Sequence, residues 1–247
     1  MRRGDEKSVS SLFEAALLVL VTAAFLFYDP FRINFRLTNI LRLKFAIFTR
    51  EPKLLSYAYM YMGSFIAKAS ALVLICLLIL SRREGLRERL RVNKPASDKW
   101  REHLLPFAIL GVIIRIYYSA NPLLPNLPIR LIFPESMLIG NTVIISSVIL
   151  IAPITEEVIF RGYLFDGLKR NFGPNTAILL TSILFAVAHI KQLGFEILPG
   201  VIIFILGALF CITREKTNSI LIPILFHGLY NLIYVLVGTL NYFLLGY

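Results

Sequence analysis

Residues 152–165 read APITEEVIFRGYLF, an apolar stretch that carries two glutamates and one arginine. The stretch lies inside a longer hydrophobic segment, 139–170, which is long enough for a helix that crosses a lipid bilayer. Ionisable side chains inside such a segment are costly and by default mark function. The stretch therefore predicts a membrane-embedded helix with a polar site within it.

The rest of the chain has the composition of a membrane protein. Of its 247 residues, 57% are hydrophobic, and the mean hydropathy is +0.73. Ordinary soluble domains are roughly 45–50% apolar. The apolar residues come in blocks separated by short polar stretches, which indicates several membrane spans. The candidate spans are 12–28, 57–80, 104–119, 139–170, 175–190, 198–213 and 219–240.

These blocks predict an all-α, polytopic helical bundle with about seven to eight transmembrane helices. The eighth would be the basic segment 31–49, if it crosses the membrane rather than lying flat as an interfacial amphipathic helix. We expect one integral membrane domain, in which 1–130 forms N-terminal membrane helices with basic loops and 131–247 holds the candidate site. Turn residues predict breaks in the second part at 171–174 and at Pro199-Gly200.

The formal net charge of +11 sits largely between the apolar blocks. It therefore indicates membrane topology and contact with anionic lipid rather than binding of nucleic acid. Segment 81–103 carries eight Lys or Arg residues and the turns at 169–174 and 213–218 carry two each, whereas 120–136 carries only Arg130. The positive-inside rule places the first three in the cytoplasm. The six basic residues of 29–56 conflict with a simple topology.

Six polar residues cluster in the apolar C-terminal segments: Glu156, Glu157, Arg161, His189, His227 and Asn231. At ~100° per residue, Glu157 and Arg161 share a helix face and predict an ion pair. Glu156 points ~140° away from Arg161 by the same geometry and is left to face another helix. The alternative is that both glutamates share Arg161.

Helix lengths place four of these side chains near one depth. If 175–190 returns antiparallel to the preceding helix, Glu156 and His189 each lie ~21 Å from the turn between them. In the last span, His227 and Asn231 lie ~14 and ~20 Å from the turn at 213–218. The pair is spaced i,i+4, so both side chains present together.

A buried glutamate beside a histidine is the make-up of a water-activating site. A histidine and an asparagine on one face can donate hydrogen bonds to an oxyanion. One carboxylate and two imidazoles could instead hold zinc with an open position. We favour metal-free activation because the HExxH spacing is absent. The two cysteines, Cys76 and Cys211, lie in apolar blocks and predict packing rather than a zinc motif.

Three motifs now carry a resemblance to a known family. They are Glu156-Glu157-x-x-x-Arg161, Phe185-x-x-x-His189 and His227-x-x-x-Asn231, in successive apolar segments. In this order they resemble the motifs of the CAAX protease and bacteriocin-processing family of intramembrane proteases, which includes the Ras-converting CAAX prenyl endopeptidases. The resemblance covers about residues 139–235.

The resemblance implies a helical bundle around a polar cavity that opens to the cytoplasm. It implies that Glu156 and His189 activate water, that His227 and Asn231 stabilise the oxyanion or bind the water, and that Glu157 with Arg161 shapes the site. Phe185 would pack beside His189. The implied substrate is the C-terminal peptide of a prenylated CAAX-type protein, met at the surface of the cell membrane.

Other functions remain open at this point. Family members are also implicated in processing leader peptides and in bacteriocin self-immunity. A transporter could use Glu156 as a proton or cation site, although such proteins tend to show internal repeats and this chain shows none. A non-catalytic membrane scaffold is the third alternative, and it predicts that loss of Glu156 leaves activity intact.

Overall fold

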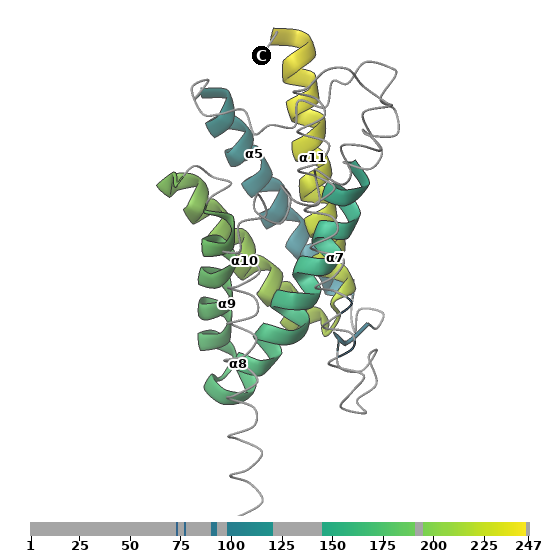
Figure 1. The fold of residues 1–247 in the computed structure, drawn as a ribbon, viewed down its shortest axis with the longest axis vertical. Coiled ribbons are helices and arrows are strands. Elements are labelled where there is room, and N and C mark those ends of the chain that lie inside the picture. Colours follow the sequence, from purple (N-terminus) through teal and green to yellow (C-terminus); the bar gives the residue numbers. More distant parts are fainter. Residues whose placement is uncertain are drawn as a thin grey trace, which may run out of the picture.

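The computed structural model of the protein describes residues 73, 77, 90–92, 98–120, 145–190 and 195–245. All the regular structure in these ranges is helical, as the sequence predicted (Figure 1). The predictions for 12–28, for 31–49 and for the loop at 120–136 lie largely or wholly outside them. The elements are η1 (Asp98–His103), α5 (Leu104–Ala120), η3 (Ser147–Ile151), α7 (Ala152–Glu157), η4 (Val158–Leu164), α8 (Phe165–Phe172), α9 (Pro174–His189), α10 (Ile197–Thr217) and α11 (Leu221–Leu245).

The helix boundaries agree with the turn signals at one place and differ at another. Gly173 has φ of 80° and separates α8 from α9, so the predicted turn at 171–174 is confirmed. The predicted break at Pro199-Gly200 is wrong, because α10 begins at Ile197. Pro199 is the third residue of the helix, where a backbone N–H has no intrahelical partner to lose.

The segment from η3 to α8 is one continuous helical run with two wider portions. η3 and η4 are π-helical, and the short α-helix α7 lies between them. Single-turn π segments within α-helices are frequent at functional sites. The quoted stretch 152–165 therefore occupies the most irregular helix of the described chain.

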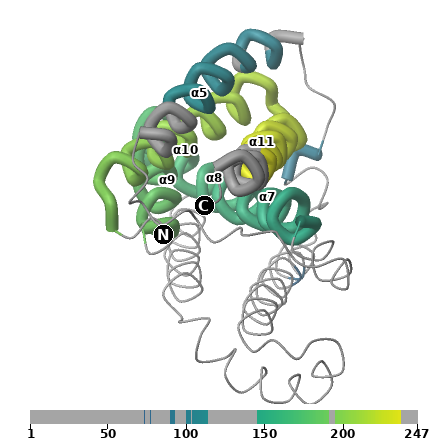
Figure 2. Tube along the Cα trace, turned by 90° about the horizontal axis from the view of Figure 1, so that it is seen from above, coloured from purple at the N-terminus to yellow at the C-terminus, as the bar shows by residue number. Residues whose placement is uncertain are grey.

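The helices pack around an aromatic core. α9 lies against α8 and α10, while α11 lies against α7 and η3 (Figure 2). α5 packs on α10 and α11 from outside, where the Phe107 ring lies 5.2 Å from that of Phe210 and 4.7 Å from that of Phe226. Stacked and edge-on aromatic rings bury large apolar areas. This packing brings α7, α9 and α11, the carriers of the predicted site residues, into one bundle.

Charges that the sequence analysis counted in two turns lie on helices instead, and two of them pair between helices. Arg214 of α10 is fully buried, and its Nη2 lies 3.2 Å from Oδ2 of Asp166 on α8. Lys169 of α8 lies 2.6 Å from Glu215 of α10. In the first pair α10 supplies the cation, and in the second α8 does. Both pairs join the same two helices. Arg214 is thus a structural group as well as a topology signal.

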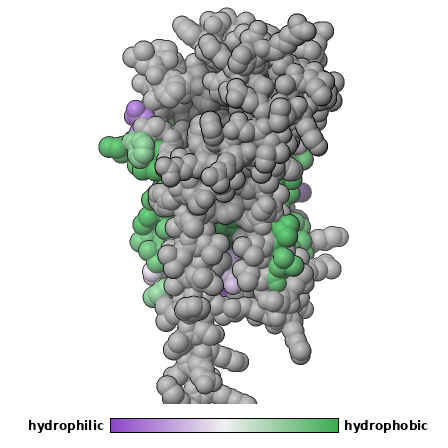
Figure 3. All heavy atoms as spheres, viewed as in Figure 1, coloured by the Kyte–Doolittle hydropathy of each residue, from purple (hydrophilic) through white to green (hydrophobic). Residues whose placement is uncertain are grey.

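Apolar side chains are exposed along regular ridges of the bundle. On α11 they recur at positions i and i+4, namely Leu221, Leu225, Leu229 and Ile233. Much of the described surface visible in Figure 3 is accordingly hydrophobic. Among the described helices, α10 alone meets the length and apolarity needed to cross a membrane, and α9 and residues 221–236 form shorter apolar helices. The number of spans stays a prediction.

Candidate active site

Glu156 and Glu157 are the last two residues of α7, at the junction with the π-helical segment η4. Their side chains enter different surroundings. Glu157 is fully buried, whereas 14% of the Glu156 side chain remains exposed. Adjacent side chains on a helix point ~100° apart. The Glu157 carboxylate therefore faces a partner within the bundle, and the Glu156 carboxylate faces a different, partly exposed side.

Three helices bring their polar side chains together at Glu156. Its Oε2 lies 3.5 Å from Nε2 of His189, at the end of α9. The same oxygen lies 3.8 Å from Nε2 of His227, in the second turn of α11. The structure thus joins the side chains that helix lengths placed at a similar depth. Their catalytic roles stay predictions.

Glu157 and Arg161 form the ion pair that their spacing predicted. Oε1 of Glu157 lies 2.9 Å from Nη1 of Arg161, and both side chains are fully buried. Nη2 of Arg161 donates to the backbone carbonyl of Gly207 on α10, at 3.0 Å. The guanidinium therefore links the helical run of residues 147–172 to α10 while it neutralises a buried carboxylate.

Aromatic rings surround this guanidinium. Its central carbon lies 4.3 Å from the ring centroid of Phe185, 4.9 Å from that of Phe210 and 5.8 Å from that of Phe160. A cation over an aromatic face is attracted by the ring quadrupole, and more strongly where water is excluded. The rings thus compensate part of the desolvation of Arg161.

Glu157 has a second partner that the sequence analysis missed. Its Oε1 also lies 2.8 Å from Nδ1 of His227. The two residues are 70 positions apart, so no local spacing rule could have paired them. The only signal was their similar depth in different helices. Glu157 is therefore placed to orient an imidazole as well as to neutralise an arginine.

The hydrogen-bond partners determine which ring nitrogen of each histidine carries a proton. Nδ1 of His189 lies 2.8 Å from the backbone carbonyl oxygen of Phe185, and Nδ1 of His227 faces the Glu157 carboxylate. Carbonyl and carboxylate oxygens accept hydrogen bonds, so each Nδ1 must donate. Both neutral rings therefore present an unprotonated Nε2 towards Glu156.

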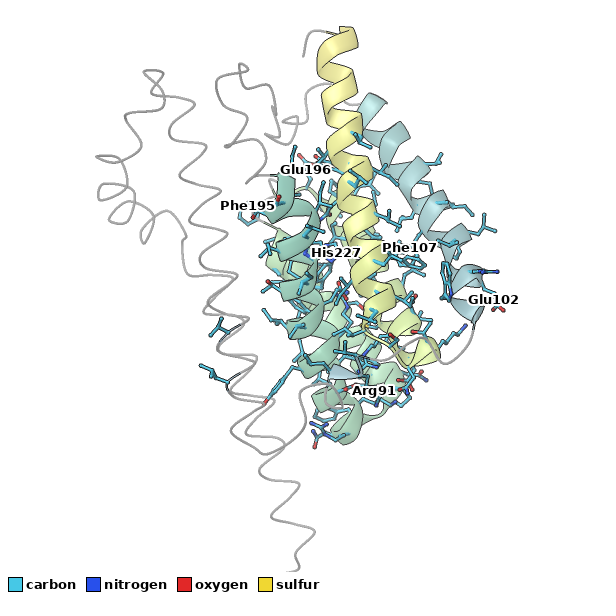
Figure 4. All side chains as sticks on the ribbon, turned by 90° about the vertical axis from the view of Figure 1, so that its right-hand side faces the viewer. Arg91, Glu102, Phe107, Phe195, Glu196 and His227 are labelled. Carbon is cyan, nitrogen blue, oxygen red and sulfur yellow. The ribbon has the colours of Figure 1, made fainter. Side chains whose placement is uncertain are left out.

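Phe185 packs where the resemblance placed it and does more than fill space. Its ring centroid lies 4.6 Å from the His189 ring and 5.9 Å from the His227 ring. The His227 ring is also stacked on Phe210, with centroids 5.1 Å apart. Figure 4 shows His227 on the side of α11 that faces the other helices. Aromatic contacts and Nδ1 hydrogen bonds thus fix both imidazoles.

Asn231 lies one turn beyond His227 on α11, as the i,i+4 spacing predicted. Its amide nitrogen Nδ2 donates to the backbone carbonyl of Val148 in η3, at 2.9 Å. One of its two amide hydrogens is thus used within the protein. A contribution of Asn231 to an oxyanion site stays a prediction.

The zinc alternative required three ligands around one point. In the part of the chain that the structure describes, no group of three His, Cys, Asp or Glu side chains is arranged to hold a metal ion. Cys211 is buried in the core, as its apolar surroundings predicted. The side chains that converge at the site are one carboxylate and two imidazoles, and the choice between metal-free and zinc-dependent activation stays a prediction.

Comparison with known proteins adds independent information. Residues 138–233 match a family model described as type II CAAX prenyl endopeptidase Rce1-like. The chain is 26% identical over 201 residues to the membrane-embedded CAAX protease MroQ of Staphylococcus aureus (strain USA300), with 74% of each chain covered. No solved structure matches the chain. The matched region contains all three motifs and every residue of the site.

The proton positions can be tested directly by ¹⁵N NMR of ring-labelled histidine. In a His103→Gln background only the two site histidines remain. In the neutral form of each ring we expect the proton on Nδ1. Glu157→Leu should change the spectrum of His227 while leaving His189 protonated on Nδ1. A wild-type spectrum with the proton on Nε2 of either ring would contradict the assigned hydrogen bonds.

Proposed function

The chain belongs to the CAAX protease and bacteriocin-processing family, and from this premise we propose that it is an intramembrane endopeptidase that removes the C-terminal peptide of prenylated CAAX-type proteins. The single observation that carries the proposal is the convergence of Glu156, His189 and His227 from three helices. Family membership supports a peptidase that acts in the membrane. The substrate and the mechanism are our proposals.

Water activation follows from the kind of atoms that converge. Oε2 of Glu156 and the two Nε2 atoms are all hydrogen-bond acceptors when the rings are neutral. A water molecule between Glu156 and His189 can donate one hydrogen to each. As its oxygen attacks the scissile carbonyl carbon, Glu156 takes one proton as general base. His189 orients the water through the second hydrogen.

His227 is positioned to stabilise the negative charge that then develops on the carbonyl oxygen. Its Nε2 lies 3.8 Å from the oxygen of Glu156 that holds the proton. A proton passed to this nitrogen gives an N–H that can donate to the oxyanion, while the Glu157 carboxylate at Nδ1 stabilises the imidazolium. The same proton then goes to the leaving amine as the C–N bond breaks. The second hydrogen of the water stays on the new carboxyl group and ionises.

A lipid-modified substrate suits the position of this site. A prenyl chain partitions into the bilayer and holds the adjacent peptide at the membrane. The exposed apolar side chains of α9 and α11 support a location of the bundle in the same phase. We propose a bundle of seven to eight spans around a site that opens to the cytoplasm. Leader-peptide processing, transport and scaffolding are the outcomes that would replace this proposal.

The orientation can be measured with single cysteines near the start of α9 and at the residue before α10. In a chain with Cys76→Ala and Cys211→Ala, Asn175→Cys lies beside the basic α8–α9 turn and Glu196→Cys lies at the opposite end. Both native residues are exposed. In intact cells, a membrane-impermeant maleimide should label position 196, and position 175 only after permeabilisation. The reverse pattern would place the basic turns outside.

The catalytic role of Glu156 can be tested with purified protein in lipid and a fluorogenic farnesylated CAAX peptide. Glu156→Ala should lower kcat/KM by at least about 1,000-fold, because it removes a group that acts in the transition state. The control Glu196→Gln removes an exposed carboxylate outside the site and should keep wild-type activity. Activity should also survive a strong zinc chelator.

Each other result has a defined meaning. Equal activity of wild type and Glu156→Ala would contradict the base assignment. Loss of activity with the chelator, restored by zinc, would contradict the metal-free mechanism. If folded wild-type protein cleaves a bacteriocin-type leader peptide but no prenylated peptide, the substrate proposal fails and the peptidase proposal stands. Cleavage of neither peptide would favour a transporter or a scaffold.

A further inference from the structure

Pro153 interrupts the hydrogen-bond ladder three residues before Glu156. A helical N–H normally donates to the carbonyl four residues back, or five back in a π segment. For residue 153 these would be the carbonyls of Ile149 and Val148, but proline has no N–H. The neighbouring N–H of Ala152 donates to Ser147, five residues back. The missing N–H therefore leaves one of these two carbonyls without the donor that any other residue would supply.

α11 lies directly on these two carbonyls. Nδ2 of Asn231 donates to the oxygen of Val148, at 2.9 Å. A Cβ atom added to Gly228 would meet the oxygen of Ile149 at 3.0 Å, so a larger residue requires the neighbouring backbone to move by a few tenths of an ångström. Two α11 residues, three positions apart and thus on one face, cover two consecutive carbonyls of η3.

This contact matters more in lipid than in water. A backbone carbonyl within the bilayer has no water to bond, so leaving it without a donor is costly. An asparagine amide from the next helix supplies the donor, and a glycine allows the approach. The proline break in one helix thus specifies both the partner helix and its register.

The same register sets the geometry of the site. His227 immediately precedes Gly228 on α11. Its two ring nitrogens must reach Glu157, at 2.8 Å, and Glu156, at 3.8 Å, in the helical run that contains Pro153. A shift of α11 by a fraction of an ångström would change both distances. Docking at Val148 and Ile149 therefore fixes the position of the imidazole.

We infer that Pro153, Gly228 and Asn231 form an interhelical lock whose role is to position His227 against the two glutamates. Because peptide hydrolysis at Glu156 is itself proposed, the effect of this lock on catalysis rests on the proposed function. Asn231 is then also a positioning residue, because one of its amide hydrogens acts through the Val148 carbonyl. Pro153 and Gly228, which lie outside the predicted site, become parts of the catalytic architecture.

A double-mutant cycle separates positioning from direct catalysis. Pro153→Ala restores the missing N–H, so the helix can satisfy its own carbonyls and depends less on Asn231. Asn231→Ala alone should lower kcat about 100-fold with little change in KM, since small misplacements of a catalytic group have effects of that order. In the Pro153→Ala background the same substitution should cost about tenfold less. An equal loss in both backgrounds would overturn the positioning role.

Glycine substitution tests the lock with Asn231 left in place. Gly228→Ala should lower kcat by a similar factor, whereas the matched control Gly200→Ala adds a methyl group where no atom lies within 4 Å and should leave kcat unchanged. Full activity of Gly228→Ala would overturn the inference. This test also decides the matter if Pro153→Ala is itself inactive.

Thermal unfolding in detergent tests the interhelical lock without any substrate. Asn231→Ala should lower the Tm of the wild-type chain more than that of Pro153→Ala, because the donor is needed only where the proline leaves a carbonyl unmet. Additive changes in Tm would overturn the lock. If the wild-type protein cleaves no peptide while this coupling is present, the proposed function fails and the lock stands.

Discussion

One buried carboxylate oxygen joins an arginine and a histidine at the centre of the described bundle. Oε1 of Glu157 lies 2.9 Å from Nη1 of Arg161 and 2.8 Å from Nδ1 of His227, in an interior without exposure. Burying a charge pair gains little stability, since its attraction is offset by desolvation, and apolar replacements are often as stable. The value of this pair lies in what it orients, namely an imidazole that faces the second glutamate.

The surrounding side chains exclude water from the Glu157–Arg161–His227 contacts and hold these groups in place. Three aromatic rings enclose Arg161, and one of them, Phe210, also stacks on His227. The backbone carbonyls before Pro153 contact Gly228 and Asn231, and these contacts position α11, the helix that carries His227. The polar site and the helix packing therefore share several residues.

Helical spacing predicted contacts within one helix, and helix lengths predicted only that Glu156, His189 and His227 lie at a similar depth. The spacing found the Glu157–Arg161 pair because an i,i+4 contact depends only on the period of the helix. It missed the contacts of Glu157 with His227 and of Asn231 with Val148, which depend on the rotation of helices about their axes. Arg214 was counted with the cytoplasmic turns, yet it is buried against Asp166 because α10 continues through the predicted turn.

The claim that Glu157 is present for His227, and not for stability, is tested most directly by replacing both members of the ion pair. Glu157→Leu alone leaves Arg161 buried without its carboxylate and should lower both Tm and activity. The double variant Glu157→Leu/Arg161→Leu should recover the Tm. Its cleavage of the prenylated peptide should nevertheless stay at least about 100-fold below wild type, because His227 has lost the acceptor that sets its tautomer. A double variant with recovered Tm and near wild-type activity would contradict the account.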